Sequence, residues 1–366
     1  MKSVFPPKLS LYLSEAYLKN FCFLAFILLG VVYLFDTVEL LRRSSEFDDV
    51  PILLILQMGL FKLPEVGQMV LPFAVLFGAI FTFWQLTRRY ELIAVRAAGL
   101  SVWQILSPIL LSAFLIGLLQ VTLINPFGAL LIGKFEALEN THLSRQTNLI
   151  SLSKQGLWLK QDHGEGHVIV HADTIDSEQW ALEKIIVLFF DETYNFVRRL
   201  DAGRAELEPG QWSFQDVVSN RPQALPEKSE FITMATDLTR EDIEDSFASP
   251  ETISFWALPS FIETMQNTGF DPVRLKLHYQ VLLSQPVLYL AMILLAACVS
   301  LRPPRNGGAF LLIASGIFVG FMIFFASSFL QALGASHQIP LVLAAWSPSV
   351  VAMLIGTTII MSLEDG

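Results

Sequence analysis

The residues whose types and spacing best fit a functional role lie in a short charged segment between two apolar runs. An acidic side chain, Glu91, stands among arginines and small apolar residues, and the segment ends at Gly99, a residue type that often terminates helices. This pattern predicts a short amphipathic helix at about residues 88–100 whose carboxylate can pair with a cation of another protein. The residues that we expect to act in this helix are Arg88, Arg89, Glu91, Leu92, Val95, Arg96 and Gly99.

Two interpretations of this helix remain open. In the first, it is a coupling helix that docks in a groove on a cytoplasmic partner, and Glu91 pairs with an Arg or Lys of that partner. In the second, it lies at the membrane surface, where its arginines contact anionic lipid head groups. A loop that only joined two membrane spans would need neither this length nor a helix.

Three histidines form the nearest approach to a metal site: His163, His167 and His171. The last two share one face of a predicted strand, because side chains alternate between the faces of a strand. A metal centre needs ligands in fixed positions, whereas Gly164 and Gly166 indicate a turn. We therefore favour an exposed hairpin over a metal site, and we expect neither a metal ion nor a cofactor.

Lys62 and Glu65 are charged residues on either side of Pro64, near the outer start of an apolar run. Charges at membrane depth are costly, although side chains near a helix end can extend to the interface. Because their signs are opposite, we interpret them as a mutually compensating pair beside a proline break. A direct contact with lipid is the alternative.

The elements that must position these residues are apolar runs of about twenty residues, the length that a helix needs to cross a membrane. Hydrophobic residues make up 53% of the 366 residues and the mean hydropathy is +0.53, which excludes an ordinary soluble protein. We therefore predict an α-helical membrane protein with six transmembrane helices. The runs are Phe21–Leu41, Leu63–Leu86, Val102–Ile124, Leu277–Leu301, Ala309–Leu333 and Leu341–Leu363.

Basic residues in the short loops predict the orientation, because cytoplasmic loops carry the excess of Lys and Arg. The N-terminal segment and the loops after the second and fourth runs are basic, whereas the loops on the opposite side have no such excess. Both termini are therefore expected in the cytoplasm, and the long segment after the third run is expected in the periplasm, outside an inner membrane. The basic residues are Lys2, Lys8, Lys19, Arg88, Arg89, Arg96, Arg302 and Arg305.

The long segment between the third and fourth runs predicts an all-β soluble domain. Short stretches rich in β-branched and aromatic residues are separated by Gly, Asp, Asn or Pro, as in the antiparallel strands of a sandwich or an open roll. Residues 127–273 contain 11 basic and 24 acidic residues, which argues against a nucleic-acid partner. The predicted domains are 1–126 and 274–366 in the membrane and 127–273 outside it. The predicted strands are 157–160, 167–171, 185–190 and 211–217, flanked by helices at 130–142 and 255–267.

The order and spacing of several short motifs resemble the LptF/LptG family of lipopolysaccharide-export permeases. A string at the start of the soluble domain, Ser153 to Lys160, resembles the LptG branch of that family more than the LptF branch. With the layout of three helices, a soluble domain and three helices, the similarity covers essentially the whole chain. The remaining motifs are Leu63-Pro64-Glu65, Pro72, Leu76, Gly78, Glu91-Leu92 and Ala97-Ala98-Gly99-Leu100-Ser101.

The resemblance implies the permease subunit of an ABC transporter that extracts lipopolysaccharide from the inner membrane and passes it to a periplasmic bridge. It implies a heterodimer with an LptF-like permease, an LptB-like ATPase dimer bound through the coupling helix, and an LptC-like protein that receives the lipid from a β-jellyroll domain. Glu91 matches the acidic residue of the family's coupling helix. The chain lacks a G-x-x-x-x-G-K-[ST] phosphate loop, so we expect ATP hydrolysis in a partner and no enzymatic activity in this chain.

The same resemblance implies where lipopolysaccharide binds. Family members often carry basic residues along the outer half of the first helix that meet lipid A phosphates, whereas this chain has Arg42 and Arg43 only at the end of that stretch. Phosphate capture is therefore assigned to these arginines or to the partner permease. The segment Leu11-Tyr12-Leu13 also lacks the basic residue usual before that tyrosine.

The apolar run Ala309–Leu333 has a high density of phenylalanines. Packing against neighbouring helices or lipid is one explanation. The resemblance implies another, in which one face of this fifth helix and the first helix line a cavity for acyl chains and membrane lipid. The expected substrate contacts are Tyr33, Arg42, Arg43, Phe321, Phe324 and Phe325, and the other phenylalanines of the run are Phe310, Phe318 and Phe329.

Two rival functions belong to other classes. In the first, an ATPase-linked permease moves its exported domain to activate a periplasmic partner without carrying a substrate, which is mechanotransmission. In the second, the chain is a membrane-embedded enzyme, but the helices contain no convincing pair of nucleophile and base and no intramembrane acid pair.

Overall fold

The computed structural model divides into two compact units. The first comprises Met1–Leu143, Ser254–Trp256 and Lys276–Gly366, and the second comprises Ser144–Ile253 and Ala257–Leu275. The residues that the structure describes are 7–45, 50–143, 149–153, 156–163, 166–176, 181–191, 193–222, 224–236, 238, 249–267, 270–300 and 309–364.

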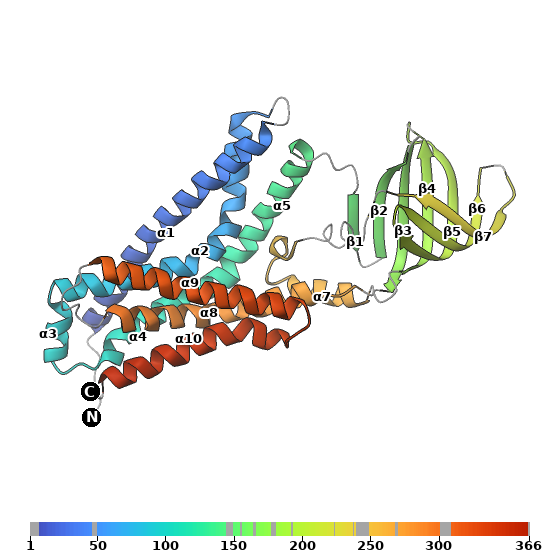
Figure 1. The fold of residues 1–366 in the computed structure, drawn as a ribbon. Helices are drawn as coiled ribbons and strands as arrows, with labels where there is room; N and C mark the ends of the chain where they lie inside the picture. The colour runs from blue at the N-terminus through green and yellow to red at the C-terminus, as the bar shows by residue number, and fades with distance from the viewer. Residues whose placement is uncertain are drawn as a thin grey trace. The chain divides into compact units, whose positions relative to one another are not determined.

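The first unit is helical, and six of its described helical segments are long and apolar enough to cross a membrane (Figure 1). The third of these segments consists of two α-helices joined by the π-helix Gln120–Ile124. The predicted six membrane-spanning helices are therefore confirmed. The helices are α1 (Pro7–Ser44), α2 (Ile52–Arg88), α3 (Glu91–Ala97), α4 (Val102–Leu119), α5 (Asn125–His142), α8 (Val273–Ser300), α9 (Ala309–Ala335) and α10 (Leu341–Glu364).

Several helices extend beyond the apolar runs that predicted them. The second begins at Ile52 and continues through both Pro64 and Pro72, so the predicted proline break at Pro64 is wrong. A proline inside a helix removes one backbone hydrogen bond, and neighbouring helices compensate for this loss within a membrane.

Close contacts between helix backbones hold the helical unit together. A Cβ atom on Gly78 would lie 3.0 Å from the Cα of Phe21 in α1, and one on Gly117 would lie 2.7 Å from the Cα of Pro286 in α8. Inside a membrane the hydrophobic effect does not drive helices together, so they associate through close packing, which small residues permit. The second contact therefore fixes how α4 lies against α8.

Gly117→Ala is expected to lower the stability of the detergent-purified protein by about 1–3 kcal/mol, because the new Cβ overlaps the backbone of α8. The melting temperature of the purified chain measures the effect. Gly30→Ala in α1 is the matched control, since a Cβ there meets nothing within 4 Å. Equal losses in the two variants would show that the contact between α4 and α8 is not responsible.

The second unit contains a seven-stranded antiparallel sheet, which confirms the predicted β-rich insert (Figure 1). Among the described residues, the strands lie side by side in their order along the chain. The helix α7 (Leu258–Asn267) and the 3-10 turn Pro250–Thr252 follow the sheet. The strands are β1 (Leu149–Ser153), β2 (Gly156–His163), β3 (Gly166–Asp176), β4 (Ala181–Asp191), β5 (Phe196–Glu208), β6 (Gln211–Asn220) and β7 (Glu227–Ala235).

The sheet curls, so that β2 approaches the end of β7. The hydroxyl of Thr236, directly after β7, donates a hydrogen bond of 2.9 Å to the side-chain oxygen of Gln161 in β2. The side chains of Leu159, Leu200 and Phe214 are almost completely buried. The sequence predicted a sandwich or an open roll, and this single curled sheet corresponds to the open roll.

Candidate coupling helix and lipid-contact faces

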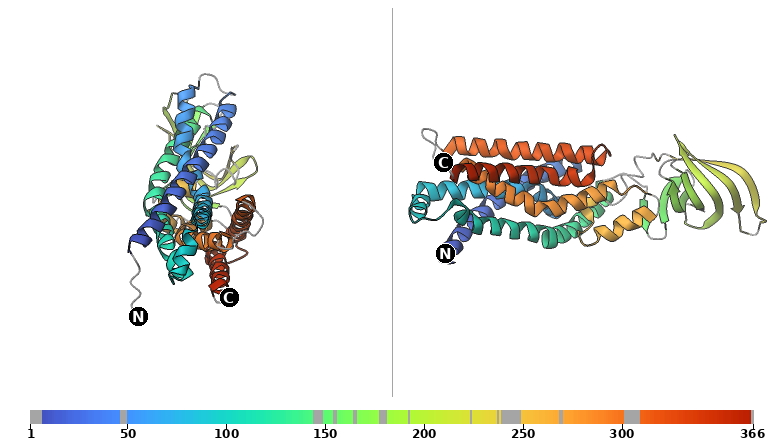
Figure 2. Two further views of the ribbon diagram at one scale, coloured as in Figure 1. Left: turned by 90° about the vertical axis from the view of Figure 1, so that its left-hand side faces the viewer. Right: turned by 90° about the horizontal axis from the view of Figure 1, so that it is seen from below.

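The predicted amphipathic helix is present as α3, between α2 and α4 (Figure 1). Tyr90, which precedes it, has φ 59°, and Gly99, which follows it, has φ 88°, so the backbone turns sharply at both ends. Ser101 and Gln104 then form a capping box that begins α4. α3 lies at the same end of the helical unit as the first turn of α1 and the last turn of α10 (Figures 1 and 2).

α3 has one face toward the helical unit and one face exposed. Leu92 is buried, and Val95 packs against the main apolar core. On the other face, Tyr90 and Ile93 are 72% and 59% exposed, and Arg96 is exposed as well. Leu92 and Val95, two of the predicted coupling residues, therefore anchor the helix to the core. The opposite, exposed face is accessible to another molecule. The other exposed coupling residues are Arg88, Arg89 and Gly99.

The carboxylate of Glu91 is half-buried and has one partner in α1 and one directly after α2. Its Oε2 accepts a hydrogen bond of 2.8 Å from the hydroxyl of Tyr12 in α1, and its Oε1 lies 3.9 Å from Nη1 of Arg89. The guanidinium of Arg88 lies 5.2 Å from the centre of the Trp84 ring, a cation–π contact. Reasoning from the sequence missed Tyr12 as a partner of Glu91, because 79 residues separate them.

The two arginines expected to bind phosphate are each paired with a carboxylate of this chain. Arg42 donates two hydrogen bonds to Glu39, at 2.9 and 2.6 Å. Nη2 of Arg43 lies 2.6 Å from Oε1 of Glu139 in α5. A phosphate that reached either guanidinium would therefore compete with a neighbouring carboxylate.

Tyr33 and Lys62 also have partners within the chain. The hydroxyl of Tyr33 donates a hydrogen bond of 3.1 Å to the carbonyl oxygen of Leu56. The ammonium of Lys62, interpreted from the sequence as the partner of Glu65, lies 3.3 Å from Oδ1 of Asp36 in α1. This ion pair joins α1 to α2.

The phenylalanines of α9 form a row on its surface. The rings of Phe321 and Phe325 stack with their centres 6.4 Å apart, and those of Phe325 and Phe329 stack at 6.3 Å. All three are at least 55% exposed. Phe324 packs on Phe73 of α2 at 5.9 Å. We name the exposed row Phe321, Phe325 and Phe329 the aromatic face.

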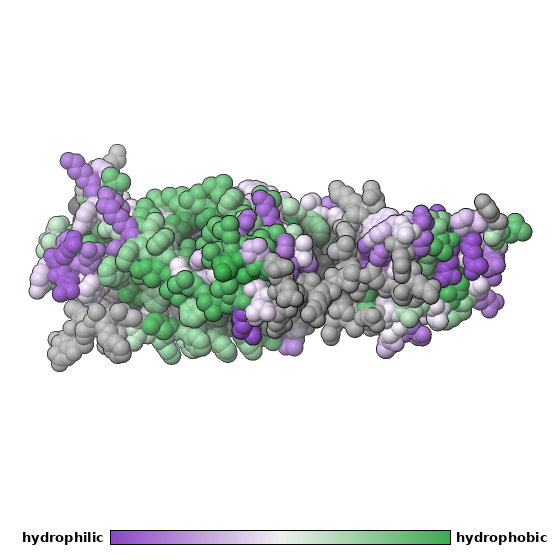
Figure 3. Space-filling view, turned by 90° about the horizontal axis from the view of Figure 1, so that it is seen from above, coloured by the Kyte–Doolittle hydropathy of each residue, from purple (hydrophilic) through white to green (hydrophobic). Residues whose placement is uncertain are grey.

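The first helix also has a largely exposed apolar surface. Phe26 and Phe35 are 79% and 75% exposed, which is far more than a helix inside a folded core would show. The helical unit has a broad hydrophobic surface, with hydrophilic residues gathered at the end where α3 lies (Figure 3). α1 and α9 therefore have apolar faces that bilayer or another protein must cover.

Comparison with known proteins agrees with this arrangement. The model of the family described as "Lipopolysaccharide export system permease LptF/LptG" matches residues 11–362. The chain belongs to the LptF/LptG family. It is 25% identical over 299 residues to the "Lipopolysaccharide export system permease protein LptG" of Haemophilus influenzae, covering 78% of this chain and 80% of that protein. It is 22% identical over 315 residues to LptG of Escherichia coli K12, covering 82% and 84% respectively. The predicted LptG-like character is thereby confirmed, and the family is one of transport permeases.

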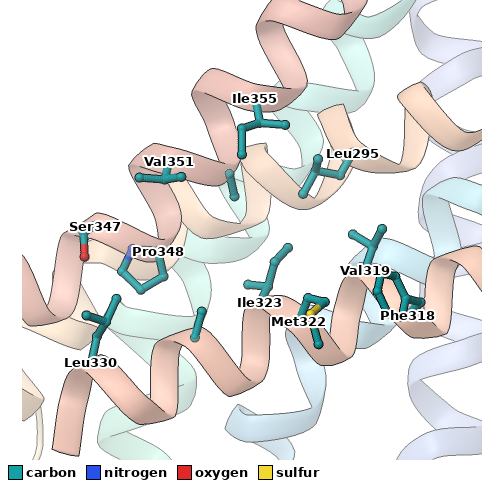
Figure 4. A pocket seen from close by; sticks show the side chains of 12 residues that line it. Leu295, Phe318, Val319, Met322, Ile323, Leu330, Ser347, Pro348, Val351 and Ile355 are labelled. Carbon is teal, nitrogen blue, oxygen red and sulfur yellow. The ribbon is translucent and has the colours of Figure 1, made fainter. Parts of the chain in front are cut away.

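This LptF/LptG permease also has an apolar pocket of about 370 Å³ between α9 and α10 (Figure 4). Phe318 and Met322 line it from α9, Pro348 and Ile355 from α10, and Leu295 from α8. Its described lining is apolar apart from Ser347. The aromatic face lies on a neighbouring side of α9, so the pocket and the predicted acyl-chain contacts are different surfaces.

In the β domain of this LptF/LptG protein, the ring of His167 stacks on Tyr194 at 4.3 Å, and the ring of His171 lies 4.2 Å from Trp158. The side chain of His163 is outside the described residues. Among the described side chains, no group of three or more His, Cys, Asp or Glu is arranged to hold a metal ion. His167 and His171 therefore both pack against aromatic rings.

Proposed function

We propose that this chain is the permease subunit of an ABC transporter that extracts lipopolysaccharide from the inner membrane and passes it to a periplasmic bridge. The observation that carries the proposal is the match to the lipopolysaccharide export permease family over residues 11–362. The exposed faces of α1, α3 and α9 support it, because they provide separate surfaces for the partners that such a transporter needs.

Three partners are proposed. An LptB-like ATPase dimer binds the exposed face of α3, where Ile93 and Arg96 are accessible. An LptF-like permease covers the apolar surfaces of α1 and α9, which leaves an intersubunit cavity for acyl chains. An LptC-like protein receives the lipid from the β domain, which corresponds to residues 127–273 with its linkers.

The proposed orientation has both termini and α3 in the cytoplasm. The first turn of α1, the last turn of α10 and α3 lie at one end of the helical unit, as this topology requires (Figure 1). Lys8 lies in the first turn of α1, and Arg88, Arg89 and Arg96 lie in or directly before α3, in agreement with the rule that cytoplasmic loops are rich in Lys and Arg. The β domain follows the third span along the chain, so it lies on the opposite, periplasmic side.

In the proposed mechanism, ATP-driven closure of the partner dimer moves α3, and the helices then compress the cavity and drive the lipid upward. Coupling of this kind requires that the two nucleotide states of the ATPase contact α3 differently. Tyr33, Phe321, Phe324 and Phe325 are proposed to contact lipid. Phosphate that binds Arg42 or Arg43 competes with Glu39 or Glu139, so the partner permease is proposed as a further source of positive charge.

The proposal is tested with the complex of this chain, its partner permease and its ATPase in vesicles that contain lipopolysaccharide. We expect ATP, but not a non-hydrolysable analogue, to cause release of lipopolysaccharide to an added periplasmic acceptor domain. Vesicles without this chain are the control. ATP hydrolysis without any lipid extraction would instead support mechanotransmission and would refute transport.

A further inference from the structure

α3 depends on tertiary contacts for its position. It has seven residues, far fewer than an isolated helix needs to be stable in water. Leu92 and Val95 hold its inner face against the core. Its first residue, Glu91, is held by the hydroxyl of Tyr12 from α1 and approached by Arg89 from the end of α2.

The two oxygens of Glu91 have different partners. Oε2 accepts the hydrogen bond from Tyr12 at 2.8 Å, and Oε1 faces Arg89 at 3.9 Å. A carboxylate has about four acceptor sites, so a cation of a partner protein can bind while the bond from Tyr12 remains. The tyrosine hydroxyl thus orients this carboxylate without occupying it.

The bond also joins α3 to the helix that crosses the whole helical unit. α1 has 38 residues, and Tyr12 lies in its second turn, whereas Arg42 and Arg43 lie in its last. At about 1.5 Å per residue, a helix of this length acts as a long rod between the two sides of the membrane. The hydrogen bond from Tyr12 is therefore a direct connection between Glu91 and α1.

We propose that Tyr12 is a positioning residue for energy coupling: its hydroxyl holds the carboxylate of Glu91 and links α3 to α1. The inference rests on the proposed function of α3 as the coupling helix. It adds a connection within this chain between the surface that meets the ATPase and the helix that lines the lipid cavity.

Tyr12→Phe removes the hydroxyl and leaves the ring. In the reconstituted complex, we expect the number of ATP molecules hydrolysed per lipopolysaccharide released to rise by roughly fivefold, as expected for the loss of one hydrogen bond of ordinary strength at an exposed site. ATPase binding should stay within about twofold of wild type, because the outer face of α3 is unchanged. A variant with an unaltered ratio would overturn the inference.

Two controls separate positioning from general damage. Ser14→Ala removes another hydrogen bond of the same helix, from Ser14 to the carbonyl oxygen of Pro108 in α4 at 3.2 Å, and should leave the ratio unchanged. In a Glu91→Ala background, Tyr12→Phe should have no additional effect, because the hydroxyl acts through Glu91. Independent, additive effects of the two substitutions would refute the link.

A second measurement does not depend on transport. In the purified full-length chain, Tyr12→Phe should speed amide hydrogen exchange in α3 by roughly fivefold, whereas Ser14→Ala should not. Unchanged exchange in α3 refutes the positioning role even if transport occurs. Absence of lipid extraction by wild type, combined with faster exchange in Tyr12→Phe, refutes the proposed function and leaves the positioning role standing.

Discussion

Glu91→Lys is expected to abolish lipopolysaccharide export and to reduce the amount of ATPase that co-purifies with the permease by more than about tenfold. The substitution replaces a carboxylate with a cation beside Arg89 and opposite the basic side chain expected on the partner. It also removes the acceptor of the Tyr12 hydrogen bond. Export is measured in cells depleted of the wild-type chain, and assembly is measured by co-purification in mild detergent.

Two further variants test whether the charge at position 91 causes the loss of export and of ATPase binding. Glu91→Gln keeps the shape and a side-chain oxygen for Tyr12, so it should bind ATPase more strongly than Glu91→Lys and more weakly than wild type. Glu15→Lys reverses the charge of an exposed carboxylate in α1, which pairs with Lys19, and should have little effect. Normal assembly and export by Glu91→Lys would remove Glu91 from the coupling mechanism.

The number of membrane-spanning helices was predictable because a membrane span imposes a length and a composition that few other structures share. Six apolar runs therefore gave six spans, even though helix ends such as Ile52 to Lys62 were missed. The π-helix at Gln120–Ile124 was not predictable, since its sequence also fits an ordinary helix.

The segments predicted as strands did not include β1, β5 or β7, and β5 was concealed because its residues Phe196–Glu208 are highly charged. Its buried positions include Leu200, Ala202, Ala205 and Leu207, so the period-two pattern shifts by one residue between Ala202 and Ala205. Small alanines and this shift weaken the alternation on which strand prediction depends.

The candidate site was only half predictable for a different reason. The composition of residues 88–100 indicated a helix, because that pattern is local in the sequence. The pairs Tyr12 with Glu91, Asp36 with Lys62 and Arg43 with Glu139 join different helices, and their partners follow from packing alone. Local patterns therefore identify a functional surface, whereas the fold determines what neutralises its charges.

Phe325→Asp is expected to reduce the rate of lipopolysaccharide extraction by about a hundredfold. The side chain is 58% exposed on the aromatic face of α9, which the proposed function assigns to the acyl-chain cavity. Acyl chains that enter the proposed cavity would bury this carboxylate in hydrocarbon, at a cost of about 2.5–3.5 kcal/mol, and 1.4 kcal/mol corresponds to a tenfold change. The rate is measured as ATP-dependent release in the vesicle assay, at matched amounts of assembled complex.

A control variant with the same charge on another lipid-accessible helix shows whether the loss of extraction arises at the aromatic face. Leu354 in α10 is 57% exposed, so Leu354→Asp carries a similar insertion cost but lies outside the proposed cavity, and it should retain most of the extraction rate. Phe325→Leu keeps the face apolar and should also retain most of it. If Leu354→Asp were as defective as Phe325→Asp, the loss would stem from helix insertion. The aromatic face would then have no special role in lipid contact, because the acyl chains would not distinguish it from the rest of the membrane surface.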